Sequence, residues 1–455
     1  MVSVMIGLEI HVQLKTRSKL FCDCTTNYLD VEPNTNLCPT CTAQPGSKPY
    51  SLNKQALDNL LKIGLALNCK IVDETVIQRK HYFYPDLPSG YQRTSKPIGI
   101  DGRLGEIRIR EVHIEEDPGR YELRDGTVDY NRAGVPLIEI VTEPDMKTPE
   151  EARKFLDELA AVLNYLDARR DEPGSTRVDA NVSIEGGTRV EVKNINSFKG
   201  VYAALMYEIV RQQSVLRKGQ KVEMETRHFD EATGTTSTMR KKESEADYRY
   251  FPDPDVPPLK ITAETVEQIK KTMPELPRAK AARFAETYKI RGEDAWILVS
   301  EIEVANLFEQ LSKGFEPQKV ALWIRGPLKK QLNYRDLMLK DLMDKGVKEQ
   351  WLTAVLSMFL NEEVTDKGME QILIGVIDKK KDPAILKREL GLEKIEDLKE
   401  IEKIIDSVVA ANQKAINDYN TCEEKALNFV VGQVVRMTKG KIDSKLAKEL
   451  ILKKI

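Results

Sequence analysis

Apolar and polar residues alternate one by one along several segments of the first half of the chain. Between Val4 and Leu14, apolar side chains occupy every second position, and Glu9, His11 and Gln13 lie between them. This period of two is typical of a β-strand with one buried face. The same alternation runs through three further segments, 107–116, 177–185 and 189–193. We therefore expect a mainly antiparallel sheet with one apolar face and one face dense in charges of both signs.

A β-bulge is predicted within the second of these strands. The alternation slips by one residue near Arg110 and Glu111. One extra residue in one strand of an antiparallel pair produces such a slip. Beyond it, His113 and Glu115 share a face.

Two helices are predicted between the strands. Thr148 and Glu151 form a capping box with Pro149 at the first helical position, ahead of apolar residues at helical spacing. A second helix is predicted over 199–217. Only three of the 21 prolines follow Pro277, so the last third of the chain is free to be mostly helical. The boundary between the strand-rich part and the helical part is predicted between about residues 260 and 295.

Composition narrows the class of protein. The 455 residues include 70 Lys and Arg against 72 Asp and Glu, a net charge of −2. This balance excludes a histone-like mode of nucleic-acid binding, which needs a large basic excess. No stretch approaches eighteen apolar residues, and the first ten residues lack a secretory pattern. We therefore expect a cytoplasmic protein that crosses no membrane.

Four of the six cysteines are grouped in two short pairs. Cys22 and Cys24 are followed, after an intervening loop, by Cys38 and Cys41. Such pairs suit a tetrahedral site with four thiolate ligands, whereas cysteines scattered through a core would not pair this way. We predict a structural zinc knuckle over 22–41, because four thiolates leave no open position for chemistry.

A second candidate site combines Glu9 and His11 with the acidic strand end that carries His113, Glu115 and Glu116. Carboxylates gathered around a histidine on one sheet face suit Mg²⁺, which takes oxygen ligands and holds substrate phosphates. A hydrogen-bonded histidine beside a solvated acidic loop would show the same residues. Spacing alone leaves both interpretations open.

Basic residues near such a site would face the phosphates of a substrate. The candidates are Arg79, Lys80, Arg177, Lys193 and Arg249. Phosphoryl transfer depends on positioning and charge neutralisation, which these residue types provide beside metal-binding carboxylates. Each of them taken alone also fits a surface ion pair. The chain has no P-loop, dinucleotide fingerprint or Gly-x-Ser-x-Gly elbow, so a nucleotide would need a different cradle.

The C-terminal end is locally basic. Basic residues outnumber acidic ones over 436–455, and they include Arg436, Lys439, Lys441 and Lys445. A solvated helical face is the commoner origin of such a run, and phosphate contact with a nucleic acid is the sharper interpretation.

Seven sequence blocks follow one another along the first 260 residues. They are GLEIHVQL at 7–14, RKHYFYPDLPSGYQ at 79–92, HIEEDPG at 113–119, VDYNRAGVPLIEI at 128–140, DANVS at 179–183, EVKNINS at 191–197 and DYRYFP at 247–252. Together they resemble the GatB family, the B subunits of tRNA-dependent aspartyl/glutamyl amidotransferases (GatCAB). FVVGQ at 429–433 resembles the YqeY-type end of that family, so the resemblance covers essentially the whole chain.

The resemblance implies an α+β fold with three parts. Residues 1–290 would form a cradle domain with a mainly antiparallel sheet, in which phosphorylation and amidation take place. Residues 291–405 would form an all-α helical domain. Residues 406–455 would form a small helical YqeY-like tail that binds tRNA.

The resemblance also implies an enzyme activity, that of a glutamine-hydrolysing ligase. ATP would phosphorylate the side-chain carboxylate of Asp on tRNA(Asn) or of Glu on tRNA(Gln), and ammonia would displace the phosphate. The family's amidase, its A subunit, would supply the ammonia, and its small C subunit would brace the heterotrimer. This agrees with the absence of a glutaminase nucleophile from the sequence.

Residue roles follow from the resemblance. Mg²⁺ would be held by Glu9, His11 and Glu115 or Glu116. Charge on the phosphates would be neutralised by Arg79, Lys80, Arg177, Lys193 and Arg249. Outer positions around the site would be filled by Asn131, Arg132, Glu139 and Glu191. The tRNA elbow would be contacted by Arg436, Lys439, Lys441 and Lys445.

Two other functions stay open on sequence grounds. A non-catalytic tRNA-binding scaffold would keep amide formation after Glu115 and Glu116 are replaced by glutamine, whereas a metal-dependent kinase would lose it. A stand-alone ligase would form the amide from free ammonium without a partner, although the sequence carries no synthetase signature.

Overall fold

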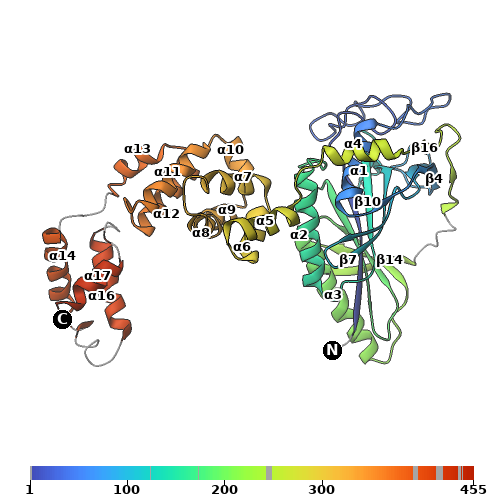
Figure 1. Ribbon diagram of the computed structural model, residues 1–455. Helices are drawn as coiled ribbons and strands as arrows, with labels where there is room; N and C mark the ends of the chain where they lie inside the picture. The colour runs from blue at the N-terminus through green and yellow to red at the C-terminus, as the bar shows by residue number, and fades with distance from the viewer. Residues whose placement is uncertain are drawn as a thin grey trace. The chain divides into compact units, whose positions relative to one another are not determined.

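The computed structural model divides by its internal contacts into two compact units, Met1–Pro277 and Arg278–Ile455, which are described separately (Figure 1). Most of the chain is described. The exceptions are residues 1–2, 123, 173, 242–247, 393–397, 414, 417–423, 439–441, 443 and 455, and the side chains of 194, 240–241, 398–401, 424–425 and 444–445.

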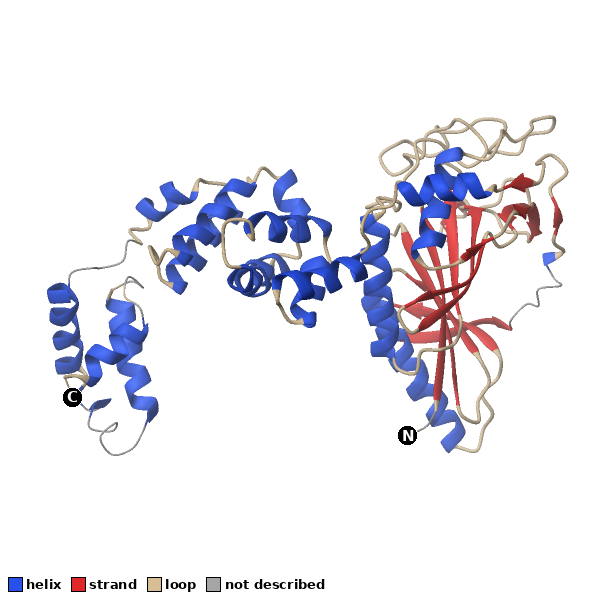
Figure 2. Cartoon of the chain, viewed as in Figure 1, coloured by secondary structure: helices blue, strands red, loops and turns tan. Residues whose placement is uncertain are grey.

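The first unit is built on one twelve-stranded sheet (Figure 2). Its main path runs β14-β13-β12-β11-β1-β10-β7-β5-β4-β15, with β6 paired to β7 and β2 to β6. These strands are β1 (Val4–Gln13), β2 (Lys70–Ile71), β4 (Ile77–His81), β5 (Tyr91–Ser95), β6 (Gly99–Leu104), β7 (Ile107–Glu116), β10 (Pro136–Thr142), β11 (Thr176–Ile184), β12 (Val190–Ile195), β13 (Glu225–Asp230), β14 (Thr235–Lys241) and β15 (Phe251–Pro252). Two small pairs join β3 (Glu74–Thr75) to β16 (Leu259–Lys260) and β8 (Arg120–Glu122) to β9 (Thr127–Asp129).

Antiparallel pairing dominates this sheet, as the alternation predicts. Among the described pairs only β12 and β13 run parallel. The predicted β-bulge is confirmed, because Val141 faces Glu111 while the next residue, Thr142, faces Ile109. The unpaired residue in β7 is therefore Arg110.

Helices of the first unit are α1 (Lys54–Ala66), α2 (Pro149–Tyr165), α3 (Phe198–Arg217) and α4 (Ala263–Lys271). The predicted N-cap is confirmed, because the Glu151 N–H donates to Thr148 Oγ1 at 3.1 Å and Pro149 opens α2. The reciprocal half of the capping box differs, because the Glu151 carboxylate accepts from the Lys147 N–H at 2.7 Å and not from that of Thr148. α2 packs against α3, and α3 against β11. Their apolar residues join those of the strands in one core that includes Ile10, Ile140 and Leu159.

The second unit is helical in all its described elements. They are α5 (Pro277–Tyr288), α6 (Gly292–Val299), α7 (Ile302–Leu311), α8 (Pro317–Trp323), a π-helical turn (Ile324–Leu328), α9 (Lys329–Tyr334), α10 (Leu339–Asp344), α11 (Glu349–Leu360), α12 (Asp366–Lys379), α13 (Pro383–Glu389), α14 (Leu398–Ala411), α16 (Glu424–Met437) and α17 (Ser444–Leu452). α5 to α13 share one apolar cluster, and α14 to α17 share another. The α+β class is thereby confirmed, while the three-part division at 290 and 405 stays a prediction. No helix in the described part of the chain is long and apolar enough to cross a membrane.

Candidate functional site

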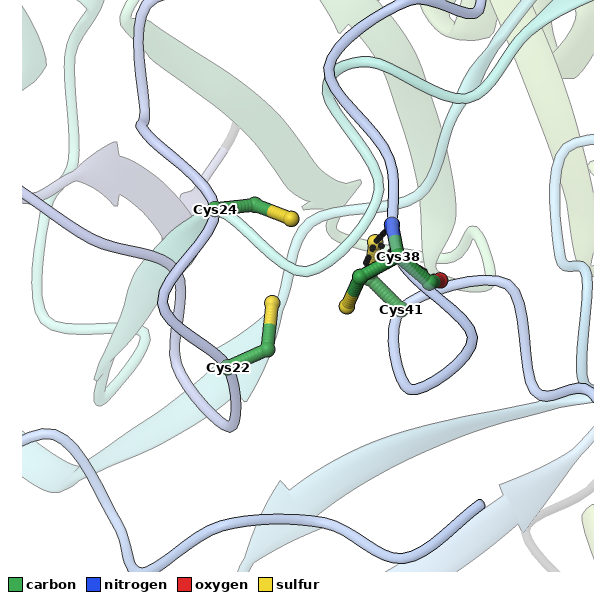
Figure 3. A group of neighbouring side chains, drawn as sticks. All are labelled: Cys22, Cys24, Cys38 and Cys41. Atoms are coloured by element: carbon green, nitrogen blue, oxygen red, sulfur yellow. Dashed lines mark hydrogen bonds between the residues drawn. The ribbon is translucent and has the colours of Figure 1, made fainter. Parts of the chain in front are cut away.

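Two loops outside the regular elements bring the paired cysteines together. Cys22 and Cys24 lie on one loop and Cys38 and Cys41 on the next, with all four sulfur atoms within 4.8 Å of one another. Figure 3 shows the four side chains pointing toward a common centre. The Cys38 N–H donates to Cys41 Sγ at 3.3 Å. The predicted cluster is confirmed, and its donor set fits a tetrahedral metal.

The electrostatics around the cysteines favour a thiolate at Cys41, whereas burial raises the pKa of Cys24 to about 11. A hydrogen bond from Cys22 lowers the pKa of Cys41 to about 5, and the same bond raises the pKa of Cys22. Lys19 is completely buried, and its Nζ lies 3.6 Å from Cys41 Sγ and 3.2 Å from the Asn36 carbonyl oxygen. A buried ammonium beside four sulfurs offsets the negative charge that a metal–thiolate group carries. Sequence reasoning did not single out Lys19.

Strand register gathers titratable residues on one face of the sheet, here called the front face. His11 in β1 lies opposite Glu139 in β10 and Arg177 in β11, and Glu139 lies opposite His113 in β7. His11 Nε2 is 3.7 Å from Glu139 Oε2 and 3.8 Å from Glu115 Oε1. One histidine nitrogen and two carboxylates thus converge within 4.8 Å, which is the donor set of a hard divalent cation.

His113 and Glu139 form the adjoining pair of this cluster, with Nε2 and Oε2 3.0 Å apart. Burial lowers the pKa of His113, but Glu139 outweighs burial and raises the value to about 9. Burial would raise the pKa of Glu139, yet His11 and His113 hold it well below its usual range. Glu139 is therefore ionised and able to act as a metal ligand.

Glu9 belongs to a second acidic group on the front face, together with Asp179 and Glu191. Lys193 Nζ lies 2.5 Å from Asp179 Oδ2 and 3.1 Å from Glu191 Oε1. The Asn181 amide donates to Glu9 Oε1 at 2.9 Å. Burial, followed by the charge of Glu139, raises the pKa of Glu9. Lys193 thus neutralises two of the three carboxylates beside the histidine cluster.

Arg177 is anchored on the same face by a buried aspartate. Its Nη2 lies 3.1 Å from both carboxylate oxygens of Asp117, and the Gln13 amide donates to Asp117 Oδ2 at 2.5 Å. Tyr28 donates to Gln13 Oε1 at 2.8 Å. Burial would raise the pKa of Asp117, but Arg177 and Arg132 lower it. The guanidinium is therefore held in one position beside His11.

Lys80 also points to the front face. Its Nζ lies 5.0 Å from the centroid of the Tyr248 ring, and Tyr248 lies edge-on to Tyr250. Burial lowers the pKa of Lys80, but Glu115 and Tyr250 outweigh burial and raise it. Within the described residues Lys80 makes no ion pair. Its charge is available to an anion that approaches Glu115.

Two further predicted residues lie on the opposite face, here called the back face. Arg79 Nε and Arg93 Nε each donate to Asp253 Oδ2 at 2.9 Å, and Arg93 Nη1 lies 3.5 Å from Glu116 Oε2. The side chain of Asp253 is completely buried. Consecutive strand residues alternate between faces, so Arg79 is separated from Lys80, and Glu116 from Glu115. The structure does not bring Arg79 or Glu116 to His11.

The remaining predicted residues lie outside this cluster. Arg249 is exposed near Phe83, and Arg436 is exposed on α16. Lys439 and Lys441, and the side chain of Lys445, fall outside the described residues.

Three front-face residues were undervalued by sequence reasoning. Glu139 was assigned an outer position, and Asp117 and Asp179 received no role. The signal was present, because all three occupy the polar side of strands or the residue that follows one. Only the strand order shows that β10 and β11 flank β1 and thereby place Glu139 and Asp179 beside His11 and Glu9.

Comparisons with known proteins identify the family of the chain. A family model described as the GatB/GatE catalytic domain matches residues 4–267, and one described as the GatB domain matches residues 306–455. The B subunit of the aspartyl/glutamyl-tRNA(Asn/Gln) amidotransferase from Methanothermobacter thermautotrophicus is 50% identical over 450 residues, which cover 99% of each chain. The corresponding B subunits from Methanobrevibacter smithii and Methanocaldococcus jannaschii are 49% and 48% identical, over 97% and 100% of this chain and 97% and 98% of their own. The chain belongs to the GatB/GatE family.

Proposed function

We propose that this chain is the amide-forming component of a tRNA-dependent amidotransferase. The γ-phosphoryl group of ATP is transferred to the side-chain carboxylate of Asp or Glu on a misacylated tRNA, which gives an acyl phosphate and ADP. Ammonia then attacks the acyl carbon, and phosphate leaves as the amide forms. The observation that carries the proposal is the convergence of His11, Glu115 and Glu139 on the face that also presents Lys80, Arg177 and Lys193.

The acidic and basic residues of the front face have different roles, metal binding and phosphate binding. His11, Glu115 and Glu139 hold Mg²⁺, with Glu9 close by, and Glu115 rather than Glu116 serves as ligand. Bound Mg²⁺ supplies charge neutralisation on the phosphates. Lys80, Arg177 and Lys193 orient the phosphates and the substrate carboxylate, and Asp117 fixes the position of Arg177.

The other parts of the assembly follow the family. The glutaminase, which is the A subunit, supplies ammonia, and the small C subunit braces the complex in the cytoplasm. The four cysteines bind structural Zn²⁺. Arg436, with Lys439, Lys441 and Lys445, contacts the tRNA through phosphates.

The test measures phosphate release from γ-labelled ATP by the assembled complex with misacylated tRNA. Release is expected to require both tRNA and Mg²⁺ and to be lost in His11→Ala. Glu143→Gln is the matched control, because Glu143 forms an exposed ion pair with Arg110 at 2.9 Å. Retained release in His11→Ala would contradict the metal site. If tRNA bound without any release, the chain would be a scaffold and its partner the catalyst.

A further inference from the structure

An exposed cluster of aromatic and basic residues lies where the sheet ends at β15. Phe83, His81, Arg249 and Phe251 form it, and it is called the aromatic edge below. The Phe83 side chain is 82% exposed and Phe251 is 43% exposed. The His81 and Phe251 rings stack at 5.0 Å with 19° between their planes, and the Arg249 guanidinium lies 6.0 Å from the Phe83 ring.

The aromatic edge is held in place by the backbone and by the back-face ion pairs. Arg249 has a left-handed backbone with φ of 46°, and its carbonyl oxygen lies 3.2 Å from His81 Nδ1. Such a φ is strained for a residue with a Cβ, and strain of this kind is concentrated at functional sites. Arg79 packs over Phe251 at 5.9 Å while it is bound to Asp253. The rings are therefore presented to solvent without a core to bury them.

The aromatic edge and the reaction site are formed by neighbouring residues of the same two chain segments, 79–83 and 248–251. Within β4, Arg79 and His81 point to the back face and Lys80 between them points to the front face, and Phe83 follows two residues beyond the strand. The Lys80 ammonium lies 5.0 Å from the Tyr248 ring, Tyr248 lies edge-on to Tyr250, and Arg249 is the residue between these two tyrosines. A flexible ligand bound across the aromatic edge is therefore close to Lys80 and Tyr248.

We propose that the aromatic edge stacks the unpaired bases at the 3′ end of the tRNA. This assignment rests on the proposed function, because the amino acid to be amidated is attached to that end. Exposed rings with an interleaved arginine suit single-stranded nucleic acid, since every base offers a π-face and the arginine adds cation–π and phosphate contacts. Arg249 therefore contacts the tRNA and not the phosphates of ATP.

The exposure of Phe83 argues against the adenine of ATP as the occupant. Small-ligand sites bury most of the surface of their ligand in a concave pocket. Phe83 stands almost entirely in solvent, which suits a chain that passes over the edge.

The test compares Phe83→Ala with wild type in the assembled complex, using intact misacylated tRNA and uncharged tRNA with and without its unpaired 3′ nucleotides. Phe83→Ala is expected to raise the KM for misacylated tRNA and the Kd for intact uncharged tRNA about tenfold, with the KM for ATP unchanged. With the truncated tRNA, wild type and variant are expected to bind equally. Phe83→Trp is expected to restore binding and to show fluorescence quenching by intact tRNA only.

Tyr334→Ala is the matched control, because Tyr334 is 84% exposed and lies beneath Arg335 at 5.7 Å in the second unit. Its effect, if any, is expected to be the same for intact and truncated tRNA. A Phe83→Ala penalty that persists with truncated tRNA, or that appears in the KM for ATP, would overturn the assignment. Wild-type kinase activity would survive that result, so failure here is distinct from failure of the proposed function.

Discussion

Charged residues lie on both faces of the sheet, but they are paired differently on each. On the back face, Asp253 is enclosed by Arg79 and Arg93, so that its charge is fully paired. On the front face, His11, Glu115 and Glu139 converge within 4.8 Å, and Lys80 makes no ion pair with any described carboxylate. The back-face ion pairs support the fold, and the front face also has ion pairs of its own at Arg177 and Lys193. Incompletely paired charges that converge mark the face that binds ligands.

Neighbouring glutamates in β7 give the sharpest test of this difference. Glu115→Gln is expected to lower amide formation by about 10²–10³-fold, because it removes a charge that faces the substrate phosphates. Glu116→Gln is expected to change the rate less than tenfold, since Glu116 contacts Arg93 on the back face. Initial rates of the assembled complex, with circular dichroism to verify folding, measure both. Equal losses in the two variants would remove the distinction between the faces.

Substitution of the buried back-face aspartate is expected to lower the free energy of unfolding. Asp253→Asn leaves two arginines without their shared carboxylate, and breaking such a buried pair is expected to cost about 3 kcal/mol of unfolding free energy. Urea unfolding of wild type and variant measures the difference. A change below about 1 kcal/mol, the usual size for an exposed pair, would show that the network is solvated.

The same pair predicts a pH dependence. Burial would raise the pKa of Asp253, but the hydrogen bond from Arg79 and the charge of Arg93 lower it below its unfolded value. A lowered folded pKa stabilises the protein above the unfolded pKa, and this stabilisation is lost as pH falls through the folded value. The stability gap between wild type and Asp253→Asn is expected to be full at neutral pH and to narrow below about pH 4. Urea midpoints measured from pH 7 to pH 3 check this, and a gap that widens in acid would contradict it.

Lys19 allows a comparison at the four-cysteine cluster, where zinc binding is proposed. Lys19→Met removes the buried charge beside Cys41 and is expected to weaken zinc binding about tenfold, as loss of an outer partner does at other sites. Lys19→Arg keeps the charge and serves as the control. Competition with a chromogenic chelator measures the affinity. Unchanged affinity in Lys19→Met would mean that the ammonium supports only the fold.

The smallest effect is expected at the exposed pair of Arg110 and Glu143. Glu143→Gln is expected to change the free energy of unfolding by less than about 1 kcal/mol, because the Arg110 side chain is 52% exposed and that of Glu143 is 28% exposed. Urea unfolding of Glu143→Gln and Asp253→Asn under the same conditions compares an exposed ion pair with the buried back-face pair. A loss equal to that of Asp253→Asn would remove burial as the cause of the difference.

Sequence patterns predicted the strands well because alternation is local. Thr148 and Pro149 likewise predicted the start of α2, and the slip near Arg110 predicted a bulge, since each depends on residues a few positions apart. The site was predicted less completely, because its members come from strands whose order the pattern does not give. Arg79 and Lys80 show this limit: both were assigned to phosphate, and pairing with Asp253 assigns one of them to the scaffold.

The bulge at Arg110 also constrains how this chain can change in length. Val112 and Ile114 point into the core beyond the bulge, as Ile107 and Ile109 do before it. Deletion of Arg110 would make β7 a regular strand and leave these side chains on their present faces. Deletion of one residue between Val112 and Glu115 would instead turn the later side chains over, placing isoleucine among the carboxylates and Glu115 in the core. Length variation in homologous proteins should therefore be excluded between Val112 and Glu115, whereas loss of one residue at the bulge should be tolerated.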